Sequence, residues 1–254
     1  MFIEERYKYI LDLLEKNGKV LVKDLSKEFN ISESMIRKDL QFLEKENLLQ
    51  RTYGGAINIK NTISSCESFN KRVEKNIDLK EIVAKKAFKE IKDNETIFLD
   101  SSTISYMIAK LIVKNNKKIT LITNMYEISS LIPVDSKAKF IFIGGDYNPF
   151  VGGSIGSYAI SQIKKSRCDK AFIGCTGFDL RDGSISTNLS EDASTKRTII
   201  SISKELFLVM LNDKFETSSS FIFSNIVDFN GIITETLPNK SIKNLLKDYY
   251  VNLI

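Results

Sequence analysis

The sequence of 254 residues contains no histidine, only three cysteines and no long apolar run. Without histidine, the Ser-His-Asp triad, histidine-based general base catalysis and the commonest metal ligand are all excluded. The cysteines, Cys66, Cys168 and Cys175, are odd in number and lack CxxC spacing, which favours a reduced protein without disulfides or structural zinc. Neither a signal peptide nor a membrane span is predicted. We therefore expect a cytoplasmic protein without metal or cofactor.

The composition that remains is that of a globular protein. Hydrophobic residues make up 43% and charged residues 27% of the chain, which does not describe a disordered protein. The length suffices for one large domain or two ordinary ones. The formal net charge of +5 permits a nucleic-acid partner without requiring one.

Residues 1–57 are predicted to form a small helical module. Apolar residues at helical spacing predict a first helix over residues 4–16, which Asn17-Gly18 would end. A short second helix turns at Asn30, and Ser32 stands where the N-cap of a third helix belongs. Two short helices joined by a tight turn predict a helix-turn-helix.

The third helix carries Ile36, Leu40 and Leu43 at the spacing of one apolar face. Its other side is rich in Ser, Arg, Lys and Gln, and such a surface could lie in a DNA major groove. Taken alone, the same pattern favours an ordinary amphipathic surface helix. The choice between these interpretations depends on the rest of the chain.

A hairpin, or wing, is predicted beyond the third helix. Gly54-Gly55 would form its tip, since glycine permits positive φ at both central positions of a tight turn. Arg51 and Tyr53 beside the tip suit a phosphate backbone or a minor groove. Residues 1–60 nevertheless carry eleven Lys and Arg against ten Asp and Glu. One such module should bind DNA weakly, so we expect a homo-oligomer.

The remainder of the chain predicts a linker and an α/β domain. Residues 58–76 are rich in Ser and Asn and lack periodicity, as linkers do. In residues 77–254, near-continuous apolar strands alternate with helices, which predicts a parallel sheet covered on both faces. The strands are expected at residues 96–100, 119–123, 139–144, 169–174, 206–211 and 231–234.

Polar groups follow most of these strands, where ligands bind in such folds. Asp100-Ser101-Ser102-Thr103 places three hydroxyls at a helix N-terminus, an arrangement that suits a phosphate. The other ends carry Thr123-Asn124, Gly144-Gly145-Asp146, Gly152-Gly153-Ser154-Ile155-Gly156, which is expected to open a helix, Gly174-Cys175-Thr176-Gly177 and Asp213-Lys214. Solvated turns account for any single one of them, because Gly and Ser are ordinary turn residues. Their recurrence at consecutive strand ends favours a binding site.

The N-terminal module resembles the DeoR family of bacterial transcriptional regulators. The resemblance rests on Asp24-Leu25, Ser32, Ile36-Arg37-Lys38-Asp39-Leu40, Leu43, Leu49, Arg51 and Tyr53-Gly54-Gly55-Ala56. The sequence departs from the family pattern at Met35, Lys38 and Tyr53, where Thr, Arg and His are usual. We expect these departures to affect which bases are read.

The C-terminal part resembles the sensor domain of the same family, which is similar to sugar-phosphate isomerases, glucosamine-phosphate deaminases and coenzyme A transferases. The matching segments are Asp100 to Ile104, Thr123-Asn124, Gly144-Gly145, Ser154-Ile155-Gly156, Glu191 to Arg197 and Lys214-Phe215. Two positions depart from the pattern. Ser102 replaces a glycine in the phosphate loop, and Leu211 stands where an aspartate is usual.

The resemblance implies a DNA-binding regulator with a winged helix-turn-helix (residues 1–57), a linker (58–76) and a parallel-sheet α/β sensor domain (77–254). It would repress a carbohydrate-use operon until a phosphorylated sugar releases the operator DNA. The expected DNA-binding residues are Ser32, Ser34, Met35, Arg37, Lys38, Gln41, Arg51, Tyr53 and Gly54. The expected effector-binding residues are Asp100, Ser101, Ser102, Thr103, Asn124, Gly145 and Lys214.

The alternative is a sugar-phosphate isomerase or deaminase with a helical N-terminal appendage. Carboxylates and a lysine could do that chemistry without histidine. No carboxylate pair stands at a recognisable catalytic spacing, however, and the N-terminal module has no role in an enzyme. We therefore expect no catalytic residues.

Overall fold

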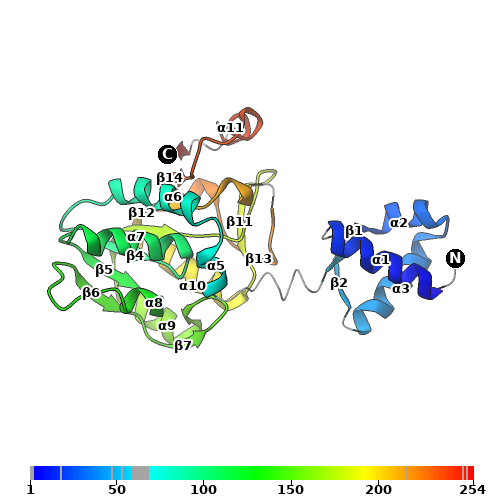
Figure 1. Cartoon of the computed structure of the whole chain (residues 1–254), viewed down its shortest axis with the longest axis horizontal. Coiled ribbons are helices and arrows are strands. Elements are labelled where there is room, and N and C mark those ends of the chain that lie inside the picture. The colour runs from blue at the N-terminus through cyan, green and yellow to red at the C-terminus, as the bar shows by residue number, and fades with distance from the viewer. Residues whose placement is uncertain are drawn as a thin grey trace. The chain divides into compact units, whose positions relative to one another are not determined.

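The computed structural model describes residues 3–17, 19–46, 48–52, 54–58, 69–215, 217–247, 249 and 251–254. The chain divides into two compact units, Met1–Glu67 and Ser68–Ile254 (Figure 1). Within those described ranges, no helix is both long and apolar enough to cross a lipid bilayer.

The first unit contains three helices and a small antiparallel sheet of strand order β1-β3-β2. Its elements are α1 (Ile3–Asn17), β1 (Lys19–Leu21), α2 (Val22–Phe29), α3 (Glu33–Lys45), β2 (Leu49–Thr52) and β3 (Gly55–Asn58). Asn30 ends α2 in the left-handed conformation, with φ 53°. The side chain of Ser32 accepts a hydrogen bond from Met35 N and caps α3, as the sequence predicted. This is a winged helix-turn-helix.

The two glycines of the wing have different roles. Gly54 has a φ of +89°, which glycine adopts readily. Gly55 has no positive φ, so the prediction that both glycines supply one is wrong. A Cβ at Gly55 would lie 2.0 Å from the carbonyl oxygen of Val20, because β1, which the sequence did not predict, pairs closely with β3 there. Tyr53 lies outside the described residues.

A buried ion pair joins α1 to α3 inside this unit. Arg6 donates through Nε to Asp39 Oδ2 at 2.6 Å and through Nη2 to Oδ1 at 2.9 Å. Asp39 is only 2% exposed, and its carboxylate raises the pKa of Arg6. Asp39 lies on the buried side of α3 with Ile36 and Leu40. The pair therefore fixes the rotation of α3 and so determines which side chains the helix exposes.

The second unit is built on a seven-stranded parallel sheet. In spatial order its strands are β15 (Asn252–Leu253), β14 (Gly231–Ile233), β12 (Ser203–Val209), β9 (Cys168–Ile173), β4 (Thr96–Leu99), β5 (Thr120–Thr123) and β6 (Lys139–Phe142). Its helices are α5 (Phe69–Glu74), α6 (Ile77–Lys89), α7 (Thr103–Lys114), α8 (Tyr126–Ser129), α9 (Gly156–Ile163), α10 (Ser190–Ser201) and α11 (Lys240–Lys247), with short turns η1 (Asn212–Lys214) and η2 (Ile226–Asp228).

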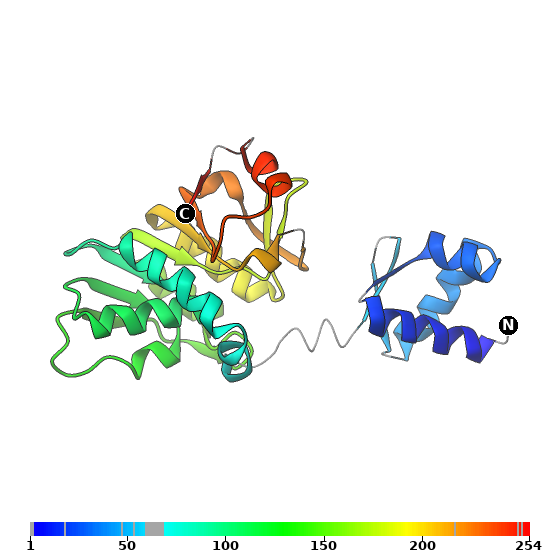
Figure 2. The ribbon, with the colours of Figure 1, turned by 45° about the horizontal axis from the view of Figure 1, so that its top comes forward.

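Helices cover both faces of this sheet, as the apolar strands predicted. Successive side chains of a strand point to opposite faces, and β4 shows the consequence. Ile97 and Leu99 pack with α6 and α7 in one core, whereas Phe98 packs with α9, α10 and α11 in the other. Figures 1 and 2 show α6 and α7 side by side over one face.

Short strands outside the main sheet were not predicted. β7 (Asp146–Asn148) pairs with β8 (Gly153–Ile155), and β10 (Gly177–Asp179), β11 (Ser184–Thr187) and β13 (Phe221–Asn225) form a third sheet. Residues 152–156 were expected to open a helix, but Gly153–Ile155 form β8 and the helix begins only at Gly156.

The predicted linker also contains a helix at its C-terminal end. Within residues 58–76, Phe69–Glu74 form α5, and the ring of Phe69 is buried against Tyr106 of α7 at a centroid distance of 5.2 Å. These residues therefore pack within the second unit. Cys66 and residues 59–68 lie outside the described residues.

The Arg6–Asp39 pair gives a first prediction. Asp39→Ala leaves the Arg6 charge buried without compensation, which costs about 3–5 kcal/mol. Hydrogen exchange of α1 and α3 amides in the full chain should show this loss, while amides of the main sheet remain protected. Asp12→Ala, which alters an exposed side chain of α1, should cost less than about 0.5 kcal/mol. Equal losses in both variants would show that the pair does not hold α3.

Candidate DNA-reading helix and effector site

The side chains predicted to read DNA are exposed on α3. Ser34, Lys38 and Gln41 recur at intervals of four and three residues and are exposed together with Arg37. At about 100° per residue, their face lies opposite the side formed by the buried residues of the helix. Met35, 47% exposed, lies beside this face. One helix therefore presents two cations, an amide, a hydroxyl and a thioether to solvent.

The exposed cations of this unit have only weak partners. Arg37 donates to Glu33 at 2.6 Å in an exposed i,i+4 pair, and such pairs contribute a few tenths of a kcal/mol. Arg51 lies 3.8 Å from Glu44, and both side chains are exposed. A phosphate could replace either carboxylate at little cost. Ser32 and Gly54 are exposed as well.

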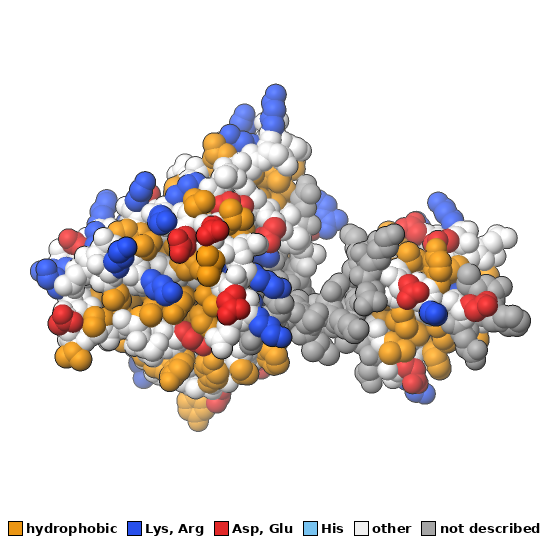
Figure 3. All heavy atoms as spheres, viewed as in Figure 1, with side chains coloured by type: hydrophobic (Ala, Val, Ile, Leu, Met, Phe, Trp, Pro, Cys, Tyr) orange, Lys and Arg blue, Asp and Glu red, His pale blue; other side chains and the backbone are white. Residues whose placement is uncertain are grey.

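Charge does not single out this face. On the side of the molecule shown in Figure 3, charged side chains of both signs lie among apolar ones over the first unit. This agrees with the near-equal numbers of cations and anions in residues 1–60. The helix geometry identifies the candidate reading surface.

In the second unit, the carboxylate of Asp100 lies directly after β4 at the strand-end edge and is fully buried. Oδ2 accepts from the amide of Gly174 at 2.8 Å and from the Lys196 ammonium. Oδ1 accepts from the amide of Ser102 at 3.1 Å and from the hydroxyl of Ser105 at 2.7 Å. All its acceptor positions are thus engaged by the protein. Asp100 positions its neighbours and has no lone pair left for an effector hydroxyl.

Ser102, the departure from the family glycine, caps α7. Its hydroxyl oxygen accepts from the amide of Ser105 at 3.1 Å. Its Cβ would lie only 2.6 Å from a Cβ built on Gly174, so the serine fills the space beside the end of β9. Ser101 and Thr103 on either side are buried. The side chain of Ser102 thus occupies space in this loop that a glycine would leave open.

Asn124 brings an unsatisfied acceptor to the same edge. Its amide nitrogen donates to Ser154 O at 2.9 Å, but its buried Oδ1 has no hydrogen-bond partner among the described residues. A Cβ on Gly153 would lie 2.8 Å from Ser101 Cβ and 2.7 Å from Asn124 O. The ends of β4 and β5 therefore meet the β7–β8 hairpin tightly. Gly145, on the approach to this hairpin, has a φ of +145° and lies against Ala159.

A group of cations lies near this edge, and only Lys214 among them was predicted. Lys80 of α6 is 8% exposed and donates to the carbonyl of Arg72. Burial, Arg72 and Lys214 together lower the pKa of Lys80 to about 8. Arg72 itself donates to Phe150 O at 2.9 Å and Val151 O at 2.8 Å in the β7–β8 hairpin.

Burial raises the pKa of the Cys175 thiol to about 12, while Lys196 and Lys214 act in the opposite direction. The charges of Lys196, Asp100 and Lys214 all act on the pKa of the Cys175 thiol, which follows β9. Lys214 therefore lies within electrostatic reach of the Asp100 edge on one side and of Lys80 on the other.

The sequence contained a signal for the missed lysines. Lys80 stands in phase with Val83, Ala84 and Ala87 on the buried side of α6, and Lys196 is likewise buried on α10. A lysine is almost never buried unless it is paired, so a lysine in phase with a buried stripe marks a functional or structural charge. Among the described residues, no group of His, Cys, Asp or Glu could hold a metal ion.

Family models match both units. The model of the DeoR-like helix-turn-helix domain matches residues 6–62, and that of the DeoR C terminal sensor domain matches residues 75–236. The chain belongs to the DeoR family. This confirms the resemblance inferred from the residues.

The relatives of this DeoR-family protein include named repressors. It is 27% identical over 249 residues to the glycerol-3-phosphate regulon repressor of Escherichia coli (strain K12), covering 98% of this chain and 97% of that one. It is 31% identical to the lactose phosphotransferase system repressor of Lactococcus lactis subsp. lactis, covering 91% of each chain.

The solved structures that resemble this DeoR-family protein include an isomerase. Ribose 5-phosphate isomerase A of Methanocaldococcus jannaschii has 16% identity and a TM-score of 0.41. The match spans 55% of each chain, and a likeness at that level carries no information on activity.

The buried network of Asp100 gives a second prediction. Asp100→Asn preserves the shape of the side chain but removes the charge that compensates Lys196, so stability should fall by about 3–5 kcal/mol. Scanning calorimetry should record a lower melting temperature for the second unit. Asp213→Asn, at an exposed carboxylate, should change stability by less than about 0.5 kcal/mol. A similar melting temperature for both variants would contradict an anchoring role for Asp100.

Proposed function

We propose that this DeoR-family protein represses a carbohydrate-use operon, that a phosphorylated sugar relieves its binding to operator DNA, and that it is not an enzyme. The observation that carries the effector part is the buried ammonium of Lys80, beside Arg72 and Lys214, at an edge that also holds an unsatisfied amide oxygen. The names of relatives support the repressor part: they refer to a glycerol-3-phosphate regulon, a lactose phosphotransferase system and an aga operon.

The cations fit a phosphate because one of them lacks a counter-ion. A lysine ammonium has three donors, and the recorded hydrogen bond of Lys80 uses one of them, to a carbonyl. In the described part of the chain no carboxylate forms an ion pair with Lys80, although Asp213 is near enough to raise its pKa. The buried Lys196, by contrast, has both Asp100 and Asp192. Burying an uncompensated charge is costly. A bound phosphate would remove that cost and use the free donors.

Two buried carboxylates at the strand-end edge, those of Asp100 and Asp192, argue against a role in catalysis. A general base needs a lone pair within reach of the substrate proton. Asp100 accepts four hydrogen bonds from the protein. Asp192 accepts from Thr187 at 2.6 Å and lies 3.9 Å from Lys196. Both carboxylates hold the fold together, which suits a sensor better than an isomerase.

Operator binding would require two copies of α3. The first unit carries little net charge, so one copy offers few phosphate contacts and the affinity of a single unit is low. Paired copies would contact two half-sites about one DNA turn apart. We expect an effector to bind one arrangement of the paired sensor units more tightly than another. It would then shift the equilibrium between arrangements in which the two copies of α3 are spaced to fit the operator and arrangements in which they are not.

The DNA-reading role of α3 gives a third prediction. Arg37→Ala should weaken binding to a fragment from upstream of the protein's own gene, and each lost phosphate contact should lower the salt slope by about 1. Lys38→Ala should cost about 1–3 kcal/mol for the native operator and little for non-specific DNA, since Lys38 faces base edges. Fluorescence anisotropy over a range of salt concentrations measures both. Lys8→Ala, an exposed cation of α1, is the control. An Arg37→Ala variant that binds like this control would contradict the assignment.

The effector site gives a fourth prediction, which concerns pH. Only the protonated amine of Lys80 attracts a phosphate, and its protonated fraction falls as the pH rises through about 8. A phosphate ester has its second pKa near 6, so its own charge is constant above neutral pH. Affinity for sugar phosphates should therefore fall between about pH 7 and 9.

Calorimetric titration of the full chain with a panel of sugar phosphates tests this. Lys80→Met should abolish binding and the rise in melting temperature that binding produces. Lys85→Met, an exposed lysine of the same helix, should retain both. Affinity that stays constant through this pH range would contradict the role of Lys80, and measurable isomerase turnover would contradict the non-enzyme assignment.

A further inference from the structure

We infer that the effector is a cyclic hexose phosphate whose ring lies against an aromatic pocket formed by Tyr126, Phe142 and Tyr147. The inference rests on the proposed function and names the ligand class of that site. Phe142 and Tyr147 belong to elements that were not predicted to contribute side chains to the site.

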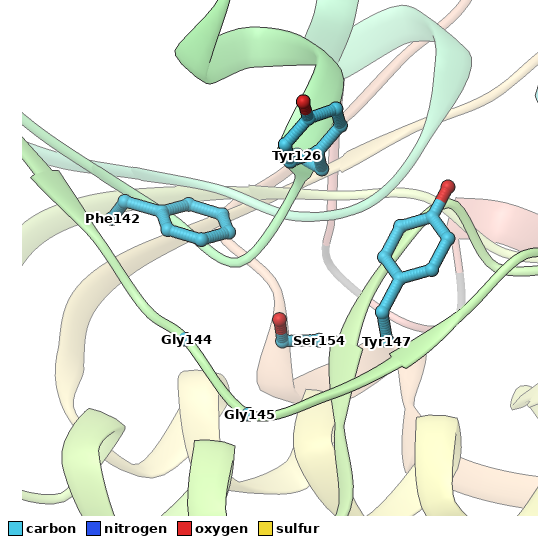
Figure 4. A pocket seen from close by; sticks show the side chains of 6 residues that line it. All are labelled: Tyr126, Phe142, Gly144, Gly145, Tyr147 and Ser154. Carbon is cyan, nitrogen blue, oxygen red and sulfur yellow. The ribbon is translucent and has the colours of Figure 1, made fainter.

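The pocket has a volume of about 430 Å³ and is lined by Tyr126, Phe142, Gly144, Gly145, Tyr147 and Ser154. Figure 4 shows the three rings around an open space, with the hydroxyl of Ser154 pointing into it. The rings of Tyr126 and Tyr147 meet edge to face at 6.1 Å, and these side chains are 58% and 50% exposed. Small-molecule sites typically measure about 300–1,000 Å³. The pocket therefore has room for more than a phosphate.

Two buried acceptors lie on residues near the pocket, and one hydroxyl lies in it. The unpartnered Asn124 Oδ1 belongs to a side chain that donates to Ser154 O. Glu127 accepts from the Tyr147 hydroxyl at 3.2 Å through Oε1, and its Oε2 is buried without a partner among the described residues. Both unsatisfied atoms are acceptors, and an unmade hydrogen bond at a buried polar atom costs about 1–3 kcal/mol. Neither residue lines the pocket, and Glu127 Oε2 lies near Gly152. The polar side chain that meets a ligand in the pocket is Ser154, whose hydroxyl can donate to or accept from a sugar hydroxyl.

The pocket adjoins the proposed phosphate site through one hairpin. Tyr147 lies on β7 and Ser154 on β8. Arg72, from the cation group, holds the carbonyls of Phe150 and Val151 in the loop between these strands. At its base, Gly153 touches Ser101 of the loop that follows β4. In the inferred complex, the anionic end of one molecule lies at the proposed phosphate site and its polyol end lies in the aromatic pocket.

The aromatic walls select a ring over a short chain. A hexose ring presents C–H groups on its faces, which pack on aromatic rings, and hydroxyls on its rim, which hydrogen-bond to acceptors. Glycerol 3-phosphate has two hydroxyls and no ring face. It would leave the rings solvated and most of the pocket empty.

Calorimetric titration of the full chain with inorganic phosphate, glycerol 3-phosphate and the 6-phosphates of glucose, galactose and fructose tests the inference. At least one hexose phosphate should bind about tenfold more tightly than glycerol 3-phosphate. Tyr147→Ala and Phe142→Ala should each remove that preference and leave the affinity for inorganic phosphate unchanged. Tyr147→Phe should retain most of it, since the ring remains. Tyr158→Ala, an exposed ring of α9 outside the pocket, is the matched control.

Different results would overturn the proposed function and the assignment of a hexose ring to the pocket. If no phosphate binds the unaltered protein, or if Lys80→Met binds as well as it does, the proposed function is overturned. If phosphates bind through Lys80 but glycerol 3-phosphate is preferred, or Tyr147→Ala keeps the hexose preference, only the ring assignment is overturned. A Tyr147→Ala variant that changes the oligomeric state in light scattering, with its sugar preference intact, would mark the pocket as a contact between copies and also overturn the assignment.

Discussion

The buried carboxylate of Asp100 is the interaction on which the sensor unit depends. Four donors reach it from three parts of the fold: the start of α7, the turn after β9, and α10. Because a buried carboxylate is tolerated only when it is paired and hydrogen-bonded, none of these parts can move without exposing an uncompensated charge. The loops that end β4 and β9 are thereby fixed against α10 and form a rigid frame at the edge of the sheet.

Two buried lysines on this frame have opposite roles. Lys196 forms ion pairs with Asp100 and Asp192, so its charge stabilises the fold. Burial, Arg72 and Lys214 lower the pKa of Lys80 and Asp213 raises it, with a net pKa of about 8. Its recorded hydrogen-bond partner is a carbonyl. The positive charge available for an anion is therefore that of Lys80, since Lys214 is paired with Asp213 at 3.3 Å. The carboxylate that resembles a ligand-binding residue in the sequence is the anchor, and a lysine on a buried helix face is the better candidate for binding.

The sequence predicted what local patterns can encode. The apolar runs of β4, β5 and β9 and the spacing of Ile36, Leu40 and Leu43 identified the sheet and α3, since their burial leaves a periodic signal. β1, with three residues, and β15, with two, are too short for such a signal. The role of Gly55 depends on Val20 passing close to it, and the pocket depends on α8, β6 and β7 converging. Contacts between distant segments leave no trace in either local sequence, so these features required the structure.

Under the proposed function, α5 would connect effector binding with DNA binding. In the sequence, ten residues separate the last strand of the wing from α5. This helix packs on α7 through Phe69 and Tyr106, and its Arg72 connects it to the candidate site. Lys80 donates to the carbonyl of Arg72, and Arg72 holds the tip of the β7–β8 hairpin. A ligand that recruits Lys80 or orders Tyr147 competes with, or reinforces, the bonds that keep α5 in place. An effector changes an equilibrium only through contacts that differ between two states. Under the proposed function, the bonds around Arg72 would be such contacts, on the first helix described after the DNA-binding unit.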